Sequence, residues 1–173
     1  MRIIVSGPLH AGKTTRVRAL VEALAARAVP LAGYLSPAVR SDDGIAGYDL
    51  EAIGTGERAP LLRRAVGERG GAPELTVGSF RFVAAGLERA RDIVRRSGPG
   101  DFLVVDEVGP AELEGRGVWP ALGPLLEDPG RSVLLVVRAS LADAFRRRLG
   151  GRPALVRTDD ADFEKRALAE IAR

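Results

Sequence analysis

The sequence predicts an α/β fold in three layers, with helices on both faces of a mostly parallel central sheet. Three observations predict this class. Short apolar runs, such as Ile3 to Val5, alternate with stretches whose apolar residues recur every three or four positions. A glycine-containing loop joins the first run to the first such stretch. Residues 41–62, rich in Gly and Asp with short apolar alternations, predict a small antiparallel insertion beside the main sheet.

The chain of 173 residues has the size of one domain, so we expect residues 1–173 to form a single unit. It has no Cys and one His, so neither a disulfide framework nor a zinc or nickel site is expected. No apolar run approaches the ~20 residues that cross a bilayer, and no signal-peptide layout precedes the first strand. These features predict a soluble, cytoplasmic protein with no membrane partner. The oligomeric state stays open, with a monomer favoured.

The net charge of +3 is carried mainly by arginine, because Lys13 and Lys165 are the only lysines. An Arg-rich composition is one mark of nucleic-acid binding. Here the arginines are interleaved with Asp and Glu instead of forming one block. We therefore do not expect nucleic-acid binding as the main role.

Residues Gly7 to Thr14 fit the phosphate-binding pattern G-x-x-x-x-G-K-S/T without a mismatch. The two glycines let the backbone fold back so that successive N–H groups point at phosphate oxygens. Lys13 adds a positive charge for the terminal phosphates, and Thr14 offers a hydroxyl to Mg²⁺. The nucleotide-binding residues expected from this loop are Gly7, Pro8, Leu9, His10, Ala11, Gly12, Lys13, Thr14 and Thr15.

The residues on either side of this loop supply the context that it requires. Ile3 to Val5 is a β-branched run typical of a strand buried on both faces. After the loop, apolar residues recur between Val17 and Leu24 with the period of a helix that has one apolar face. A strand and a helix therefore bracket the loop. The alternative is a turn that carries Gly-Lys-Thr by chance.

The next elements follow in order. Leu31 to Leu35 predicts a second strand, which leaves Arg40 near the sheet edge where ligands bind, as a phosphate contact or as a solvated loop residue. Residues 67–73 predict a loop, and residues 76–82 a short strand. Residues 83–94 have helical periodicity and precede a Ser-Gly-Pro-Gly stop.

Phe102 to Val105 is an apolar run that predicts a buried strand, with Asp106 and Glu107 at its C-terminal end. Downstream of a phosphate loop, this is the pattern of a Walker B segment. We expect Asp106 to anchor Mg²⁺ together with Thr14, directly or through water. Glu107 is expected to orient or deprotonate the attacking water. The alternative for Glu107 is a helix cap or a surface carboxylate.

Ser132 to Val137 is the most apolar run and predicts a central strand. It places Arg138 at the same edge as the phosphates, as a catalytic sensor of the γ-phosphate. Ser140 and Asp143 predict a capping box for the next helix. The arginines at 146–148 are expected to form a solvated face of that helix. A strand at 153–156 and a helix from 163 to 171 close the chain.

Four segments carry a family resemblance: Gly7 to Thr15, Gly33 to Leu35 with Arg40, Val77 to Phe80, and Val104 to Leu113. In order and spacing they resemble the small nucleoside-triphosphatase family that includes cancer-related nucleoside-triphosphatase. The resemblance covers essentially the whole chain. It implies a RecA-like, ASCE-type P-loop domain that hydrolyses ATP, GTP, CTP or UTP to the diphosphate and phosphate with Mg²⁺.

By this resemblance Lys13 and Thr14 bind phosphate and magnesium, Asp106 binds magnesium and Glu107 activates water. The chain also departs from the family pattern. Residues 37–38 are Pro-Ala where acidic residues are usual, and residues 45–46 supply no basic residue before the Gly-aromatic pair. Residues 8–11 lack a further glycine that is common there.

Two other functions remain open on the same scaffold. A small nucleotide or metabolite kinase needs an acceptor pocket and lid arginines, for which residues 146–148 and Arg152 are available. A nucleotide-dependent switch is the second alternative. The chain has no Asn/Thr-Lys-x-Asp segment to read guanine, so such a switch would be ATP-bound.

Overall fold

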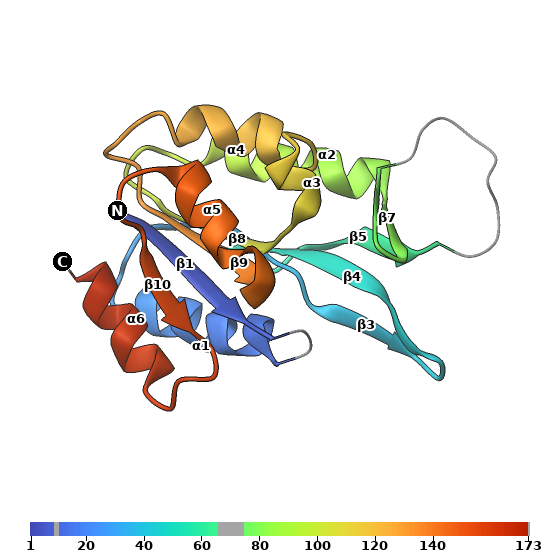
Figure 1. Cartoon of the computed structure of the whole chain (residues 1–173), viewed down its shortest axis with the longest axis horizontal. Helices are drawn as coiled ribbons and strands as arrows, with labels where there is room; N and C mark the ends of the chain where they lie inside the picture. Colours follow the sequence, from blue (N-terminus) through green and yellow to red (C-terminus); the bar gives the residue numbers. More distant parts are fainter. Residues whose placement is uncertain (9–10, 66–74, 173) are drawn as a thin grey trace.

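The computed structural model describes residues 1–8, 11–65 and 75–172, and within these residues ten strands form one mixed sheet. Their order is β10-β1-β9-β8-β2-β4-β5-β7-β6, with β3 paired to β4 (Figure 1). The strands are β1 (Arg2–Gly7), β2 (Leu31–Leu35), β3 (Ala38–Ser41), β4 (Gly44–Ala52), β5 (Arg58–Arg64), β6 (Thr76–Val77), β7 (Phe80–Phe82), β8 (Phe102–Val108), β9 (Val133–Arg138) and β10 (Ala154–Arg157). The α-helices are α1 (Lys13–Ala25), α2 (Ala84–Arg96), α3 (Pro110–Leu113), α4 (Trp119–Leu125), α5 (Ala142–Leu149) and α6 (Phe163–Ile171).

Five strands, β10, β1, β9, β8 and β2, pair in parallel and carry the phosphate-binding end of the molecule. Their apolar runs alternate between the two faces of the sheet. Ile3 and Val5 pack on one face, whereas Ile4 packs on the other. The predicted central strand is confirmed, since β9 lies between β1 and β8.

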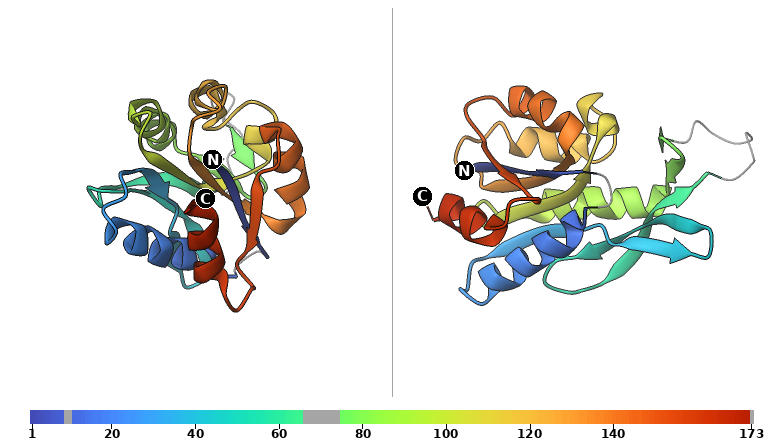
Figure 2. Two further views of the ribbon diagram at one scale, coloured as in Figure 1. Left: turned by 90° about the vertical axis from the view of Figure 1, so that its left-hand side faces the viewer. Right: turned by 60° about the horizontal axis from the view of Figure 1, so that its bottom comes forward.

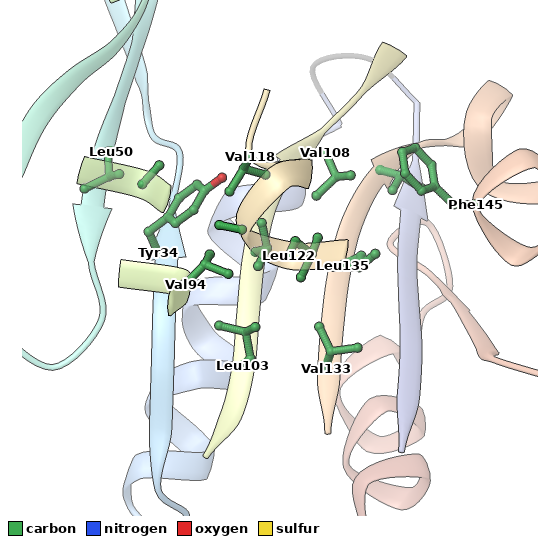
Figure 3. Close-up of a cluster of buried hydrophobic side chains, with 14 of the residues drawn as sticks. Tyr34, Leu50, Val94, Leu103, Val108, Val118, Leu122, Val133, Leu135 and Phe145 are labelled. Atoms are coloured by element: carbon green, nitrogen blue, oxygen red, sulfur yellow. The ribbon is translucent and has the colours of Figure 1, made fainter. Parts of the chain in front are cut away.

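Two hydrophobic clusters separate the three predicted layers. One cluster packs the sheet against α2, α4 and α5, through Val94, Leu122 and Phe145 among others (Figure 3). The other packs the opposite face against α1 and α6, through Leu20 and Phe163. Figure 2 shows α1 and α6 on the face opposite α4 and α5. The prediction of an α/β fold in three layers is therefore confirmed. The prediction of a mostly parallel sheet is wrong, because four strand pairs are parallel and five are antiparallel among the described strands.

The antiparallel part of the sheet is larger than the sequence analysis expected. It begins at Ala38, continues through β7, and joins the parallel part where β2 pairs with β4. The strands expected beside the main sheet are thus a continuation of it. Figure 1 shows the β3–β4 hairpin extending beyond the tip of β1, where the phosphate loop lies.

Three smaller predictions were also tested. The strand expected at 76–82 is a hairpin of β6 and β7. The capping box at Ser140 is wrong, because a 3₁₀ turn, Ala139–Leu141, precedes α5 and no side chain caps that helix. The loop expected at 67–73 lies outside the described residues. Among the helices that the structure describes, none combines the length and apolar character needed to cross a membrane.

Candidate active site

The phosphate loop has the predicted context, between β1 and α1. Gly12 precedes the first residue of α1 with φ of 67°, a left-handed conformation that favours glycine. Its carbonyl accepts a hydrogen bond from the Arg16 amide at 3.0 Å. The first N–H groups of α1 are thereby directed at the loop, as phosphate binding requires. Leu9 and His10 belong to the predicted loop but lie outside the described residues.

Gly7 is fixed by packing. A Cβ atom at this position would lie 2.0 Å from the Thr158 hydroxyl oxygen. Thr158 is buried directly after β10, and its amide donates to the Ser6 carbonyl at 2.8 Å. The residue that follows β10 therefore packs against the start of the phosphate loop, and no larger side chain fits at Gly7.

Asp106 and Thr14 form the centre of the site. The Thr14 hydroxyl donates to Asp106 Oδ2 at 2.8 Å, although 92 positions separate the two residues. Asp106 is fully buried and also accepts the amides of Ser36 at 3.0 Å and Glu107 at 2.8 Å. Burial raises the pKa of the Asp106 carboxyl, and these hydrogen bonds oppose the rise.

The oxygens gathered here fit a magnesium ion. Thr14 supplies a hydroxyl and Asp106 a carboxylate, the hard donors that Mg²⁺ prefers. The Ser36 hydroxyl beside them is buried and has no hydrogen-bond partner among the described residues. This buried hydroxyl is a further oxygen donor that a bound Mg²⁺ ion or one of its waters would contact.

Glu107 is aimed by a β-bulge. Strands β8 and β9 pair at Val105 with Leu135 and again at Val108 with Val137, so β8 carries one extra residue. Within this bulge Glu107 has φ of 58°, which is costly for a residue with a side chain. Bulges of this kind redirect side chains next to active sites. Here the side chain of Glu107 lines the cleft beside the phosphate loop.

The charges around Glu107 suit a general base. Burial, followed by the Asp106 carboxylate, raises the pKa of Glu107 to about 7. The positive charges of Lys13 and Arg138 act in the opposite direction. Lys13 is buried, and its Nζ donates to the Pro8 carbonyl at 2.9 Å. Arg138 shares a second, smaller cavity with Glu107.

A cleft of about 320 Å³ opens between the phosphate loop and the β3–β4 hairpin. The phosphate-loop side includes the predicted residues Ala11, Gly12, Lys13, Thr14 and Thr15, with Glu107 at its base. Arg18, on α1, also lines the cleft. The remaining lining residues come from the end of β2 and from the β3–β4 hairpin, and had no predicted role or a role left open: Ser36, Pro37, Ala38, Arg40, Ile45 and Tyr48. Ser36 carried a usable signal, because it is a polar residue directly after a buried strand.

Glu112, in the Val104 to Leu113 segment of the family resemblance, is a structural residue. Its carboxylate is almost fully buried and accepts the amides of Gly109 at 2.8 Å and Val118 at 3.0 Å. A Cβ atom at Gly117 would lie 1.8 Å from this carboxylate. Glu112 therefore fixes the turn that follows Glu107.

Comparison with known proteins identifies the family of the chain. A family model described as NTPase matches residues 2–167. Cancer-related nucleoside-triphosphatase of Homo sapiens is 30% identical over 138 residues, which cover 76% of this chain and 72% of that protein. Nucleoside-triphosphatase THEP1 of Thermococcus kodakarensis is 30% identical over 149 residues, covering 84% and 81% respectively.

Solved structures agree with these matches. The solution structure of a human cancer-related nucleoside triphosphatase has a TM-score of 0.70 at 25% identity, covering 99% of this chain and 95% of that chain. The crystal structure of THEP1 from the hyperthermophile Aquifex aeolicus covers 100% of both chains, with a TM-score of 0.74 and 23% identity. The chain therefore belongs to the small P-loop NTPase family of the cancer-related nucleoside-triphosphatases and THEP1.

Proposed function

We propose that this chain is an Mg²⁺-dependent nucleoside triphosphatase that hydrolyses ATP, GTP, CTP and UTP to the diphosphate and phosphate. The contact between the Thr14 hydroxyl and the Asp106 carboxylate at 2.8 Å carries this proposal, because it joins both Walker segments at one point. Lys13 and Glu107 line the same cleft. The names of the relatives support the same activity for the family.

The residues divide the chemistry between them. The phosphate-loop amides and Lys13 hold the β- and γ-phosphates, and Thr14 with Asp106 would hold the metal. When bound, Mg²⁺ neutralises charge on the phosphates. Glu107 accepts a proton from the water whose oxygen attacks the γ-phosphorus. The bond from that phosphorus to the β–γ bridging oxygen breaks, and Arg138 offsets charge near Glu107.

The surroundings of Glu107 support water as the acceptor. The cavity that Glu107 shares with Arg138 measures about 20 Å³ and is lined in part by Phe80 and Phe82, so it has room for about one water. The arginines proposed as a kinase lid are partly engaged elsewhere, since the Arg148 guanidinium lies 3.9 Å from the centre of the Trp119 ring. Hydrolysis is therefore favoured over transfer to a metabolite.

The strand order supports a finer assignment. We propose a single RecA-like, ASCE-type domain over residues 1–173, because β9 is inserted between the phosphate-loop strand β1 and the strand of Asp106. This order supports the proposal that Arg138, at the end of β9, senses the γ-phosphate. A monomer remains the favoured oligomeric state.

Phosphate release by the purified protein tests the proposed function. We expect wild type to release phosphate from ATP, GTP, CTP and UTP with Mg²⁺, and EDTA to abolish the release. Lys13→Ala should reduce the rate ~10²-fold or more, because it removes a charge that stabilises the transition state. Release by Lys13→Ala at the wild-type rate would show that the site is wrongly assigned.

A further inference from the structure

The cleft has a second wall that the proposed mechanism does not use. It is formed by the end of β2 and by the β3–β4 hairpin, which contributes Arg40, Ile45 and Tyr48. This wall and the phosphate loop line the same cleft. Figures 1 and 2 show the hairpin projecting past the end of β1 on this side.

Irregular pairing shapes this wall. Between Val39 and Arg40 the register of β3 with β4 shifts, so that Arg40 pairs with Ile45. A second shift, between β4 and β5, lies directly after Tyr48. Bulges re-aim the side chains beside them and concentrate near functional sites. Both shifts here flank residues that line the cleft.

The arginines in and beside the β3–β4 hairpin differ in whether their guanidinium groups already have hydrogen-bond or ion-pair partners. Arg63 donates to the carbonyl of Tyr48 at 3.1 Å and pairs with Asp49 at 2.5 Å. Arg64 donates twice to the Ile45 carbonyl, at 3.1 and 2.9 Å. These two arginines join β5 to β4, and their guanidinium groups are engaged outside the cleft.

Among the cleft-lining residues the cations are Lys13, Arg18 and Arg40. Arg18 is hydrogen-bonded to the Glu51 carboxylate, so its charge is already balanced. The Lys13 charge is opposed by Asp106 at the base of the cleft. Arg40 is exposed, and within the described residues its guanidinium makes no hydrogen bond or ion pair.

We infer that Arg40 is a further catalytic residue, whose guanidinium contacts the γ-phosphate and stabilises the charge of the transferring phosphoryl group. This inference rests on the proposed function. A Mg²⁺–triphosphate complex brings net negative charge into the cleft, and among the described residues that line it Arg40 is the cation without a carboxylate partner. The planar fork of arginine suits phosphate oxygens. A donor placed on the developing charge is worth ~10²–10³-fold in rate.

The test compares Arg40→Ala with Arg64→Ala, which removes an equal charge from the neighbouring strand β5, outside the cleft. Single-turnover hydrolysis of Mg-ATP is measured beside equilibrium binding of Mg-ADP, alone and with aluminium fluoride as a mimic of the transferring phosphoryl group. For Arg40→Ala we expect the rate and the mimic affinity to fall ~10²-fold, with Mg-ADP affinity within about threefold of wild type. The hydrolysis rate of Arg40→Lys should lie between the rates of wild type and Arg40→Ala. Millimolar guanidinium should restore part of the rate that Arg40→Ala loses.

Each other outcome is decisive. If Arg40→Ala hydrolyses ATP as fast as Arg64→Ala and binds the mimic as tightly, the role of Arg40 is overturned. An equal loss of affinity for Mg-ADP and for the mimic would also overturn it, because that pattern shows uniform binding. A wild type that releases no phosphate overturns the proposed function, and this inference with it. Activity in wild type and its loss in Lys13→Ala preserve the proposed function whatever Arg40 does.

Discussion

Asp106 and Glu107 are neighbours in the chain but lie in different surroundings. Asp106 is fully buried and accepts three hydrogen bonds, from Thr14, Ser36 and Glu107. Glu107 has a left-handed backbone, and the structure records no hydrogen bond to its carboxylate among the described residues. One carboxylate is therefore fixed by the protein, whereas the other is left to act on a ligand.

This difference predicts opposite behaviour for two conservative substitutions. Glu107→Gln should keep nucleotide and metal affinity and lower the hydrolysis rate ~10²-fold or more, because only the base is lost. Asp106→Asn should lower both Mg-nucleotide affinity and turnover, since it removes a charge that stabilises the ground state and the transition state. Equilibrium binding of a fluorescent triphosphate and single-turnover hydrolysis separate the two patterns.

Urea unfolding of both variants is the control for this prediction. It is needed because Asp106→Asn alters the acceptor of three hydrogen bonds, whereas no hydrogen bond to the Glu107 carboxylate is recorded among the described residues. Hydrolysis near the wild-type rate by Glu107→Gln would remove Glu107 from the mechanism. The residue that positions water would then have to be sought around Arg138.

At the scale of single elements, helix α1 ends in a conformation that its sequence does not favour. The Val29 amide donates to the Leu24 carbonyl at 3.2 Å and the Ala28 amide to the Ala25 carbonyl at 2.9 Å. This is the Schellman pattern, in which glycine is the usual left-handed residue. Here that residue is Ala28, with φ of 56°.

Ala28→Gly should therefore stabilise the protein by roughly 0.5–1 kcal/mol, because glycine adopts this conformation without steric cost. Ala28 is exposed, so no packing is lost. Ala26→Gly is the matched control: Ala26 is also exposed but has φ of −61°, and glycine there should destabilise. Urea unfolding measures both variants. Equal changes in the free energy of unfolding for Ala28→Gly and Ala26→Gly would contradict this prediction.

At the scale of the whole molecule, one carboxylate links the phosphate-loop helix to the antiparallel extension. Glu51 on β4 is hydrogen-bonded to Arg18 on α1 and pairs with Arg58 at the start of β5 at 2.5 Å. The hydrogen bond from Arg18 is the main reason that the pKa of Glu51 is lowered. This contact joins segments that are distant in the sequence.

The lowered pKa predicts a dependence of stability on pH. A carboxylate whose pKa is lower in the folded state adds stability above its unfolded pKa, and that stability is lost as the pH falls through the folded pKa. Wild type should therefore lose more free energy of unfolding than Glu51→Gln when the pH falls below about 4.5. Urea unfolding from pH 7 to pH 3 measures the difference. Glu57→Gln, at an exposed carboxylate paired with Arg89, serves as control. Parallel curves for wild type and Glu51→Gln would contradict the prediction.

The parts predicted from the sequence are those set by local pattern. The phosphate loop and Asp106 follow from short motifs, and the parallel strands from buried apolar runs. The partner of β4 could not be predicted, since its alternating residues look the same in a lone hairpin and in a continued sheet. Tyr48 reaches the cleft only through the long-range pairing of β4. The left-handed backbone of Glu107 could not be predicted either, because glutamate has no preference for this conformation.

Among the described strand pairs, the register shifts lie in β3–β4, β4–β5 and β8–β9, at Arg40, Tyr48 and Glu107. Side chains alternate between the faces of a strand, so deleting one bulged residue would turn every later side chain to the opposite face. In β8 the result would be a regular ladder with β9 and a new direction for the carboxylate that lines the cleft. The irregular pairing thus gives up ladder regularity in exchange for the directions of side chains around one cleft.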